Sequence, residues 1–186
     1  MGGSRGEAEK GVEGRNELPR FAPPPRIVPR MLVTFLRHAE AEDEVTTDFE
    51  RRLTAKGLEQ ADKVGKFCVR YGLIPDVIVT SPVVRAEQTA QAVSKRLDGR
   101  EVIVERWLAC GMSPGDCFEA LAPYAKFDHV MLVGHEPDFS AAIAACIGLP
   151  DSGRVLVRKA SLTGIDLRRL RAGAGRLEFT LPVRLM

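Results

Sequence analysis

Two histidines and two arginines of the sequence stand where predicted strands end or within one helical turn beyond. Arg37 and His38 directly follow the first β-branched run, and His135 follows a later one. Ser81 follows the second run, and Arg85 comes one helical turn after it. Guanidinium groups bind phosphate oxygens through paired hydrogen bonds, and a neutral imidazole is a competent nucleophile toward phosphorus. These residue types therefore predict phosphoryl chemistry.

The elements that must position these residues are short β-branched runs alternating with helical patterns, which is typical of an α/β fold. Strands are predicted at residues 31–36, 76–80, 101–105, 129–133, 155–157, 162–167 and 177–183, with a turn at 171–175. Helices are predicted at residues 54–71, 81–97, 113–125 and 139–147. We expect a three-layer αβα sandwich with a mostly parallel central sheet. In such sheets, ligands bind beyond the carboxyl ends of the strands.

The start of the second predicted helix adds hydrogen-bond donors that could bind phosphate. Ser81 is a good helix cap and Pro82 suits a first helical turn. The free N–H groups at a helix start attract anions. Ser81 is therefore a candidate for phosphate binding alongside Arg37 and Arg85.

Composition excludes several other classes of protein. The 186 residues carry 27 basic and 25 acidic side chains, a net charge of +2, which is too small for binding nucleic acid through its phosphates. No uncharged apolar stretch approaches the roughly 20 residues of a membrane helix. The four cysteines lack the close pairing of a zinc or redox motif, and the amino terminus lacks a signal peptide. We expect a cytoplasmic protein without a membrane or nucleic-acid partner.

The sequence changes character at Met31. Residues 1–30 hold five glycines and five prolines without a helix or strand period, which is typical of disorder. This segment also contributes the whole net charge, since it has six basic and four acidic residues. We expect a disordered extension at residues 1–30 and one domain at residues 31–186. Translation starting at Met31 and a docking role for the extension both stay open.

Four ordered motifs carry a resemblance to a known family. They are LRHAEAE at residues 36–42, RRLTAKG at 51–57, SPVVRAEQTA at 81–90 and LVGHEPD at 132–138. Together they resemble the histidine phosphatase superfamily, which is phosphoglycerate mutase-like in fold, and within it the SixA-type phosphohistidine phosphatases. The resemblance runs from Met31 to about residue 149.

The resemblance implies a role for each matching residue. His38 would accept the phosphoryl group as a covalent phosphohistidine, and Arg37 and Arg85 would bind the phosphate. His135 would contact the phosphoryl oxygens, and Arg51 would lie nearby. These roles imply a metal-independent phosphohydrolase without a cofactor.

The sequence departs from the family pattern in two places. Ala39 follows the histidine where the best-known motif has glycine. The family's usual general acid is a glutamate after the third strand, and Glu105 matches that position only approximately. The proton donor therefore stays open among Glu105, Glu42, Glu136 and Asp138.

The absence of a clear match for the general acid indicates which kind of leaving group the substrate carries. A phosphate ester releases an alkoxide that needs a proton, whereas phosphohistidine releases an imidazole that is already protonated. We therefore expect a protein-borne phosphohistidine in a signalling or carrier protein as substrate. Alternatives are a small phosphorylated metabolite, cleaved by a phosphomonoesterase of the same superfamily, and a catalytically silent phosphoprotein-binding module. A phosphomutase is disfavoured because residues 31–186 leave little chain to enclose a substrate.

Overall fold

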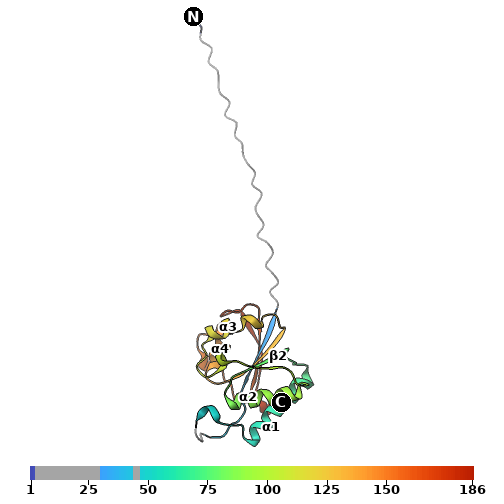
Figure 1. The fold of residues 1–186 in the computed structure, drawn as a ribbon. Helices are drawn as coiled ribbons and strands as arrows, with labels where there is room; N and C mark the ends of the chain where they lie inside the picture. The colour runs from blue at the N-terminus through green and yellow to red at the C-terminus, as the bar shows by residue number, and fades with distance from the viewer. Residues whose placement is uncertain (3–29, 44–46) are drawn as a thin grey trace.

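The computed structural model describes residues 1–2, 30–43 and 47–186 (Figure 1). The predicted disordered extension therefore lies almost entirely outside the described residues. Its last residue, Arg30, donates a hydrogen bond from Nε to Asp166 Oδ2 at 3.1 Å. Asp166 itself is 6% exposed, so this ion pair fixes Arg30 to the folded domain.

A six-stranded sheet forms the centre of the protein, in the order β3-β2-β4-β1-β5-β6. The strands are β1 (Met31–Arg37), β2 (Val77–Thr80), β3 (Val102–Val104), β4 (His129–Gly134), β5 (Leu162–Leu167) and β6 (Gly175–Leu181). The pairings β1–β4, β2–β4 and β2–β3 are parallel, and β1–β5 and β5–β6 are antiparallel. The prediction of a mostly parallel sheet is confirmed.

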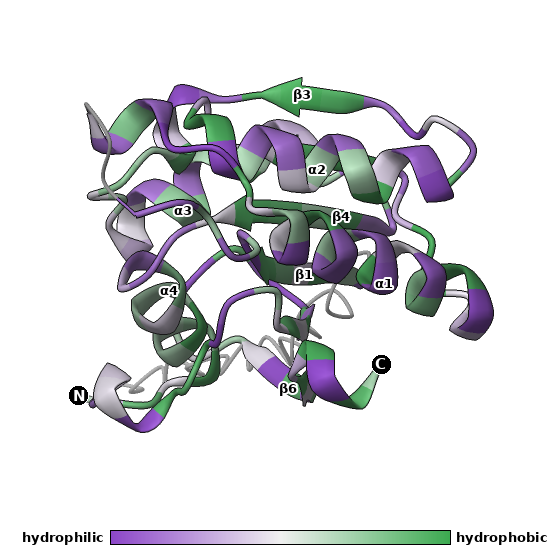
Figure 2. Ribbon diagram, turned by 90° about the horizontal axis from the view of Figure 1, so that it is seen from below, coloured by the Kyte–Doolittle hydropathy of each residue, from purple (hydrophilic) through white to green (hydrophobic). Residues whose placement is uncertain are grey.

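Helices cover both faces of this sheet, which confirms the three-layer prediction (Figure 2). The buried side chains of α1 (Ala55–Tyr71) and α2 (Val84–Arg96) pack with Leu36 and Ile78 of the sheet. Those of α3 (Pro114–Ala120) and α4 (Asp138–Ile147) pack with Phe35 of the opposite face. No helix in the described part of the chain combines the length and apolar character needed to cross a membrane.

The described residues also form five short 3-10 helices, four between these elements and one after the last strand. They are η1 (Asp48–Glu50), η2 (Arg106–Leu108), η3 (Ala122–Tyr124), η4 (Ser152–Arg154) and η5 (Val183–Leu185). The first of them, η1, lies between β1 and α1 in sequence and contacts α2 in space. It thereby brings its side chains close to the carboxyl ends of the parallel strands.

The start and stop signals in the sequence act as expected at three helices. The Thr54 side chain accepts a hydrogen bond from the Gly57 N–H at the start of α1, and Gly72 ends that helix with φ of 68°. Ser113 and Asp116 form a capping box at the start of α3. Gly148 ends α4 with φ of 71°. These boundaries follow from local hydrogen bonding alone.

The predicted start of the second helix is wrong by two residues. Helix α2 begins at Val84, and Val83 rather than Ser81 is its cap residue. The Ser81 hydroxyl instead accepts a hydrogen bond from the Val83 N–H at 3.2 Å, which closes a turn before the helix. The Ser81 side chain is thereby freed from capping the helix.

Three other elements differ from the prediction by more than one residue. Residues 155–157 are irregular and belong to none of the six strands of the sheet. The predicted helix at 113–125 divides after Ala120, since Pro123 in η3 has no N–H to continue it. The last strand spans Gly175–Leu181 rather than 177–183, and Pro182 follows it.

A close backbone approach explains the glycine of the RRLTAKG motif. A Cβ at Gly57 would lie 1.9 Å from the backbone oxygen of Glu40. The same oxygen accepts a hydrogen bond from the Thr54 N–H at 3.1 Å. The first turn of α1 therefore rests directly on the segment that follows β1, the segment that carries His38.

We predict that Gly57→Ala destabilises the fold by about 1–3 kcal/mol, the usual cost of forcing atoms into a filled space. The backbone around Glu40 must move, so kcat should fall as well. Gly115→Ala in α3 is the matched control, because its Cβ would meet only the Ser113 hydroxyl at 3.7 Å. Urea denaturation of both variants measures the difference. Equal stability of the two variants would show that the Gly57 contact is unimportant.

Candidate active site

The parallel pairing of β1 and β4 brings the two candidate histidines together. Arg37 at the end of β1 is paired with Gly134 at the end of β4. The His38 N–H continues this ladder by donating to the Gly134 carbonyl oxygen at 3.0 Å. The imidazole rings of His38 and His135 consequently lie 5.3 Å apart between centroids, with 52° between their planes.

The His38 ring is held with one unprotonated ring nitrogen. Nδ1 lies 2.8 Å from the backbone oxygen of Ala39, which can only accept, so Nδ1 carries the proton. Nε2 then presents its lone pair and accepts a hydrogen bond from Arg85 Nε at 3.2 Å. Burial lowers the pKa of His38 to about 3, opposed by the Ala39 bond. The ring is therefore neutral at pH 7, as a nucleophile requires.

The His135 ring is held in the opposite way, through its Nε2 atom. Nε2 lies 2.8 Å from the Ser81 hydroxyl, which already accepts from the Val83 N–H. The hydroxyl proton is satisfied if it is donated to His135 Nε2, which places the ring proton on Nδ1. Burial, reinforced by Arg85, lowers the pKa of His135 to about 4. This neutral ring therefore offers an N–H donor at Nδ1.

Arg85 is a buried cation in contact with His38. The Arg85 side chain is 5% exposed, and it donates from Nη1 to the Asp48 backbone oxygen at 2.6 Å. It also donates from Nη2 to Asp48 Oδ2 at 2.9 Å. Together with the bond to His38, three of its five N–H groups are used. One N–H on each Nη atom is left for an anion.

Arg37 completes the positive charge of the site. Its Nη1 donates to the Val157 backbone oxygen at 2.9 Å, which orients the guanidinium. Burial lowers the pKa of Arg37, and the charge of Glu136 opposes that shift. Three buried side-chain polar atoms in the described residues have no hydrogen-bond partner, and two of them are Arg37 Nε and His135 Nδ1. Both are donors, which fits binding of an oxyanion.

Arg51 reaches the site through a residue that the sequence analysis missed. Arg51 Nη1 donates to Asp48 Oδ1 at 2.9 Å, and its Nε donates to the Glu42 backbone oxygen. Asp48 thus bridges Arg51 and Arg85. The three-residue spacing of Asp48 and Arg51 was a signal for this ion pair. The predicted site residues therefore lie together. Arg51 is linked to the site through Asp48, and Ser81 is linked to it through His135.

Each of the four acids considered as proton donor accepts a hydrogen bond from another group. Glu105 Oε1 accepts from the Tyr124 hydroxyl at 2.9 Å. Glu42 Oε2 accepts from the Arg52 N–H, and Glu136 Oε1 accepts from the Ser140 N–H. Asp138 Oδ2 accepts from the N–H groups of Gly111 and Met112. Burial raises the pKa of Glu136, partly offset by its bonds to Ser140.

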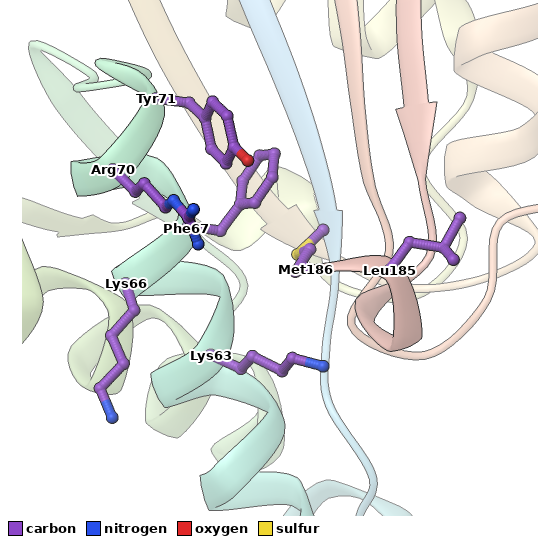
Figure 3. A pocket seen from close by; sticks show the side chains of 7 residues that line it. All are labelled: Lys63, Lys66, Phe67, Arg70, Tyr71, Leu185 and Met186. Atoms are coloured by element: carbon purple, nitrogen blue, oxygen red, sulfur yellow. The ribbon is translucent and has the colours of Figure 1, made fainter.

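A separate cavity of about 290 Å³ lies between α1 and the C-terminal residues (Figure 3). Its lining residues are Lys63, Lys66, Phe67, Arg70, Tyr71, Leu185 and Met186. None of these is a histidine or a carboxylic acid. This cavity therefore lacks the neutral imidazole that distinguishes the site around His38.

No group of three or more His, Cys, Asp or Glu side chains is arranged for a metal ion within residues 30–43 and 47–186. The positive groups that face the two histidines are guanidiniums. Arg37 and Arg85 are therefore the groups of the described site that can neutralise a bound phosphate.

Comparison with known proteins identifies the class to which this site belongs. Residues 33–109 match the family model of the histidine phosphatase superfamily, branch 1. An uncharacterized protein of Picosynechococcus sp. is 34% identical over 157 residues, covering 80% of this chain and 89% of that protein. The chain therefore belongs to the histidine phosphatase superfamily, and this membership supports phosphatase activity.

Solved structures agree with this assignment. SixA from Agrobacterium tumefaciens aligns with a TM-score of 0.70 and 26% identity, over 82% of this chain and 97% of that one. The protein histidine phosphatase SixA in complex with tungstate aligns with a TM-score of 0.75 and 20% identity, over 83% and 99%. The predicted SixA-type, phosphoglycerate mutase-like fold is confirmed.

We predict that the free energy of unfolding falls as the pH drops from about 6.5 to 4. In this window unfolded histidines bind protons, whereas folded His38 and His135, with pKa values of about 3 and 4, stay neutral. Each contributes a slope of at most about 1.4 kcal/mol per pH unit. His38→Gln should flatten the slope, measured by urea denaturation at several pH values. An unchanged slope in this variant would contradict a buried neutral His38.

Proposed function

We propose that this protein is a phosphohistidine phosphatase that acts through a covalent phosphohistidine on His38. One observation carries the proposal: the neutral His38 ring is held by Ala39 with Nε2 unprotonated and facing the Arg85 guanidinium. A nucleophile and a phosphate-binding cation are thus already in contact. We take residues 31–186 as the phosphatase domain.

The first chemical step transfers the phosphoryl group to His38. Arg37 and Arg85 bind the phosphoryl oxygens, and His135 donates a hydrogen bond from Nδ1. When phosphate oxygens accept the hydrogen bonds of Arg85, its bond to His38 Nε2 is broken. The Nε2 lone pair is then free to attack phosphorus. A bond from Nε2 to phosphorus forms while the bond to the leaving group breaks, and the leaving group takes that electron pair. Charge on the transferred group is stabilised by fixed donors, as in other phosphoryl transfers.

The second step returns the enzyme to its starting state. A water molecule attacks phosphorus, the bond to His38 Nε2 breaks, and its electron pair returns to the imidazole. Inorganic phosphate is released with the oxygen of that water. Because the Ala39 carbonyl retains the proton on Nδ1, the ring leaves this step in the tautomer in which it began.

The surroundings of Glu105, the acid that approximately matches the family's general acid, support a phosphoramidate substrate over a phosphate ester. An ester leaving group needs a proton donor, and Glu105 is hydrogen-bonded to Tyr124 instead. A phosphorylated imidazole can carry its own proton on the second ring nitrogen. Related SixA proteins support the same substrate class by their fold, and one of them binds tungstate, a tetrahedral oxyanion like phosphate. The fold alone does not define the leaving group.

We predict that the full chain releases phosphate from a histidine-phosphorylated carrier protein and carries an acid-labile, alkali-stable label during turnover. His38→Ala should lose both the label and at least about 1,000-fold in kcat, since no other group replaces the nucleophile. Rapid-quench labelling with ³²P measures the intermediate. The same assay with p-nitrophenyl phosphate and sugar phosphates tests the phosphomonoesterase alternative.

His129→Asn is the matched control, because His129 is buried and bonded to Thr34 rather than to the site. This variant, checked for folding by circular dichroism, should retain the label. A wild-type chain that binds the phosphorylated carrier without releasing phosphate would support the silent-module alternative. A label that persists in His38→Ala would contradict the assignment of the nucleophile.

A further inference from the structure

A carboxylate borders the solvent side of the phosphate-binding arginine. Asp48 Oδ2 accepts from Arg85 Nη2, and Asp48 Oδ1 accepts from Arg51 Nη1, both at 2.9 Å. The Asp48 side chain is 54% exposed, whereas the Arg85 side chain is 5% exposed. Two arginines therefore fix this carboxylate where the buried site meets the solvent.

The leaving group of a substrate must depart on this side of the site. His38 is only 7% exposed, and its Nε2 atom faces the buried Arg85 guanidinium. In an in-line displacement the leaving group lies opposite the nucleophile across phosphorus. A nucleophile on the buried side places the leaving group on the solvent side, where the Asp48 carboxylate lies.

The charge of Asp48 restricts what this carboxylate can do. Its hydrogen bond to Arg51, together with Arg85, holds the pKa of Asp48 below its ordinary value. Asp48 is therefore ionised at neutral pH, and it accepts hydrogen bonds but does not donate a proton. An anionic alkoxide would be repelled by such a group, whereas a ring N–H or a cationic imidazolium would be attracted.

We propose that Asp48 selects the leaving group, by accepting a hydrogen bond from the protonated second ring nitrogen of a phosphorylated imidazole. This inference rests on the proposed function of His38. The bond from phosphorus to the substrate nitrogen breaks, and its electron pair goes to that nitrogen while His38 Nε2 bonds to phosphorus. The imidazole then leaves as a neutral ring, with the proton on its other nitrogen still facing Asp48.

The hydrogen bonds of Arg85 allow selection of the leaving group by Asp48 to be tested apart from the orientation of Arg85. The Asp48 backbone oxygen and His38 Nε2 also hold that guanidinium, through Nη1 and Nε. Asp48→Asn keeps the backbone bond and a side-chain oxygen that can accept from Arg85, and it removes the negative charge. Among the described residues, the charges that shift the pKa of Asp48 are those of Arg51 and Arg85, and the charge of Asp48 in turn acts on His135 and Cys110.

The test compares wild type and Asp48→Asn on two substrates: a histidine-phosphorylated carrier protein and p-nitrophenyl phosphate, whose leaving group is an anion. Asp48→Asn should lower kcat for the phosphohistidine substrate about 10-fold at pH 8, and kcat for the ester should fall much less or rise. The alkaline limb of the kcat profile for phosphohistidine should move down by about one pH unit, because the bound imidazolium loses its counter-charge.

Two variants serve as controls. Asp48→Glu keeps the charge and should restore most of the preference for phosphohistidine. Asp43→Asn removes an exposed carboxylate from the same segment and should leave both substrates unaffected. An equal loss on both substrates in Asp48→Asn, with an unmoved alkaline limb, would overturn the inference, and so would the same loss of preference in Asp43→Asn.

Failure of the proposed function has a different signature. A wild-type chain that hydrolyses p-nitrophenyl phosphate but not phosphohistidine refutes the proposed substrate, and the role of Asp48 falls with it. A wild-type chain that hydrolyses phosphohistidine, with Asp48→Asn equally impaired on both substrates, refutes the role of Asp48 alone.

Discussion

The site depends on a histidine that stays uncharged beside two arginines. An imidazolium at His38 would be repelled by Arg37 and Arg85 and would have no lone pair for phosphorus. Burial disfavours its charged form, and the Ala39 carbonyl and the Arg85 N–H bind opposite edges of the neutral ring. Each of these contacts favours the same tautomer. Under the proposed function, Arg85 would therefore both bind phosphate and keep the His38 ring in its reactive tautomer before any substrate arrives.

The rest of the fold fixes the positions of His38 and His135 relative to each other. Parallel pairing of β1 with β4 fixes His38 beside His135, and the Ser81 turn after β2 fixes the second ring. The first turn of α1 rests on the segment after His38, with only a hydrogen atom of Gly57 between them. The sheet, the Ser81 turn and the first turn of α1 thus together fix the positions of the two imidazole rings. Small changes in any of them would move His38 relative to Arg37 and Arg85.

Much of this arrangement was predictable from the sequence because it depends on local rules. Parallel strands bring their carboxyl ends together, so the residues after β1, β2 and β4 had to converge. The use of Ser81 was not predictable, because a serine before a proline suits a helix cap as well as a turn. Asp48 was missed because its role arises from contacts with Arg51 and Arg85, and the Arg85 contact joins segments far apart along the chain. The strand predicted at 155–157 does not form, and the Val157 carbonyl oxygen instead accepts a hydrogen bond from the Arg37 guanidinium.

Nuclear magnetic resonance of the histidine ring nitrogens tests the central claim most directly. In ¹⁵N-histidine-labelled protein, long-range ¹H–¹⁵N correlations distinguish the two neutral tautomers from the imidazolium. The account predicts that His38 shows a protonated Nδ1 and a bare Nε2, and that this pattern persists from pH 8 to pH 5. A His38 ring that carries its proton on Nε2, or that becomes an imidazolium near pH 6, would contradict it.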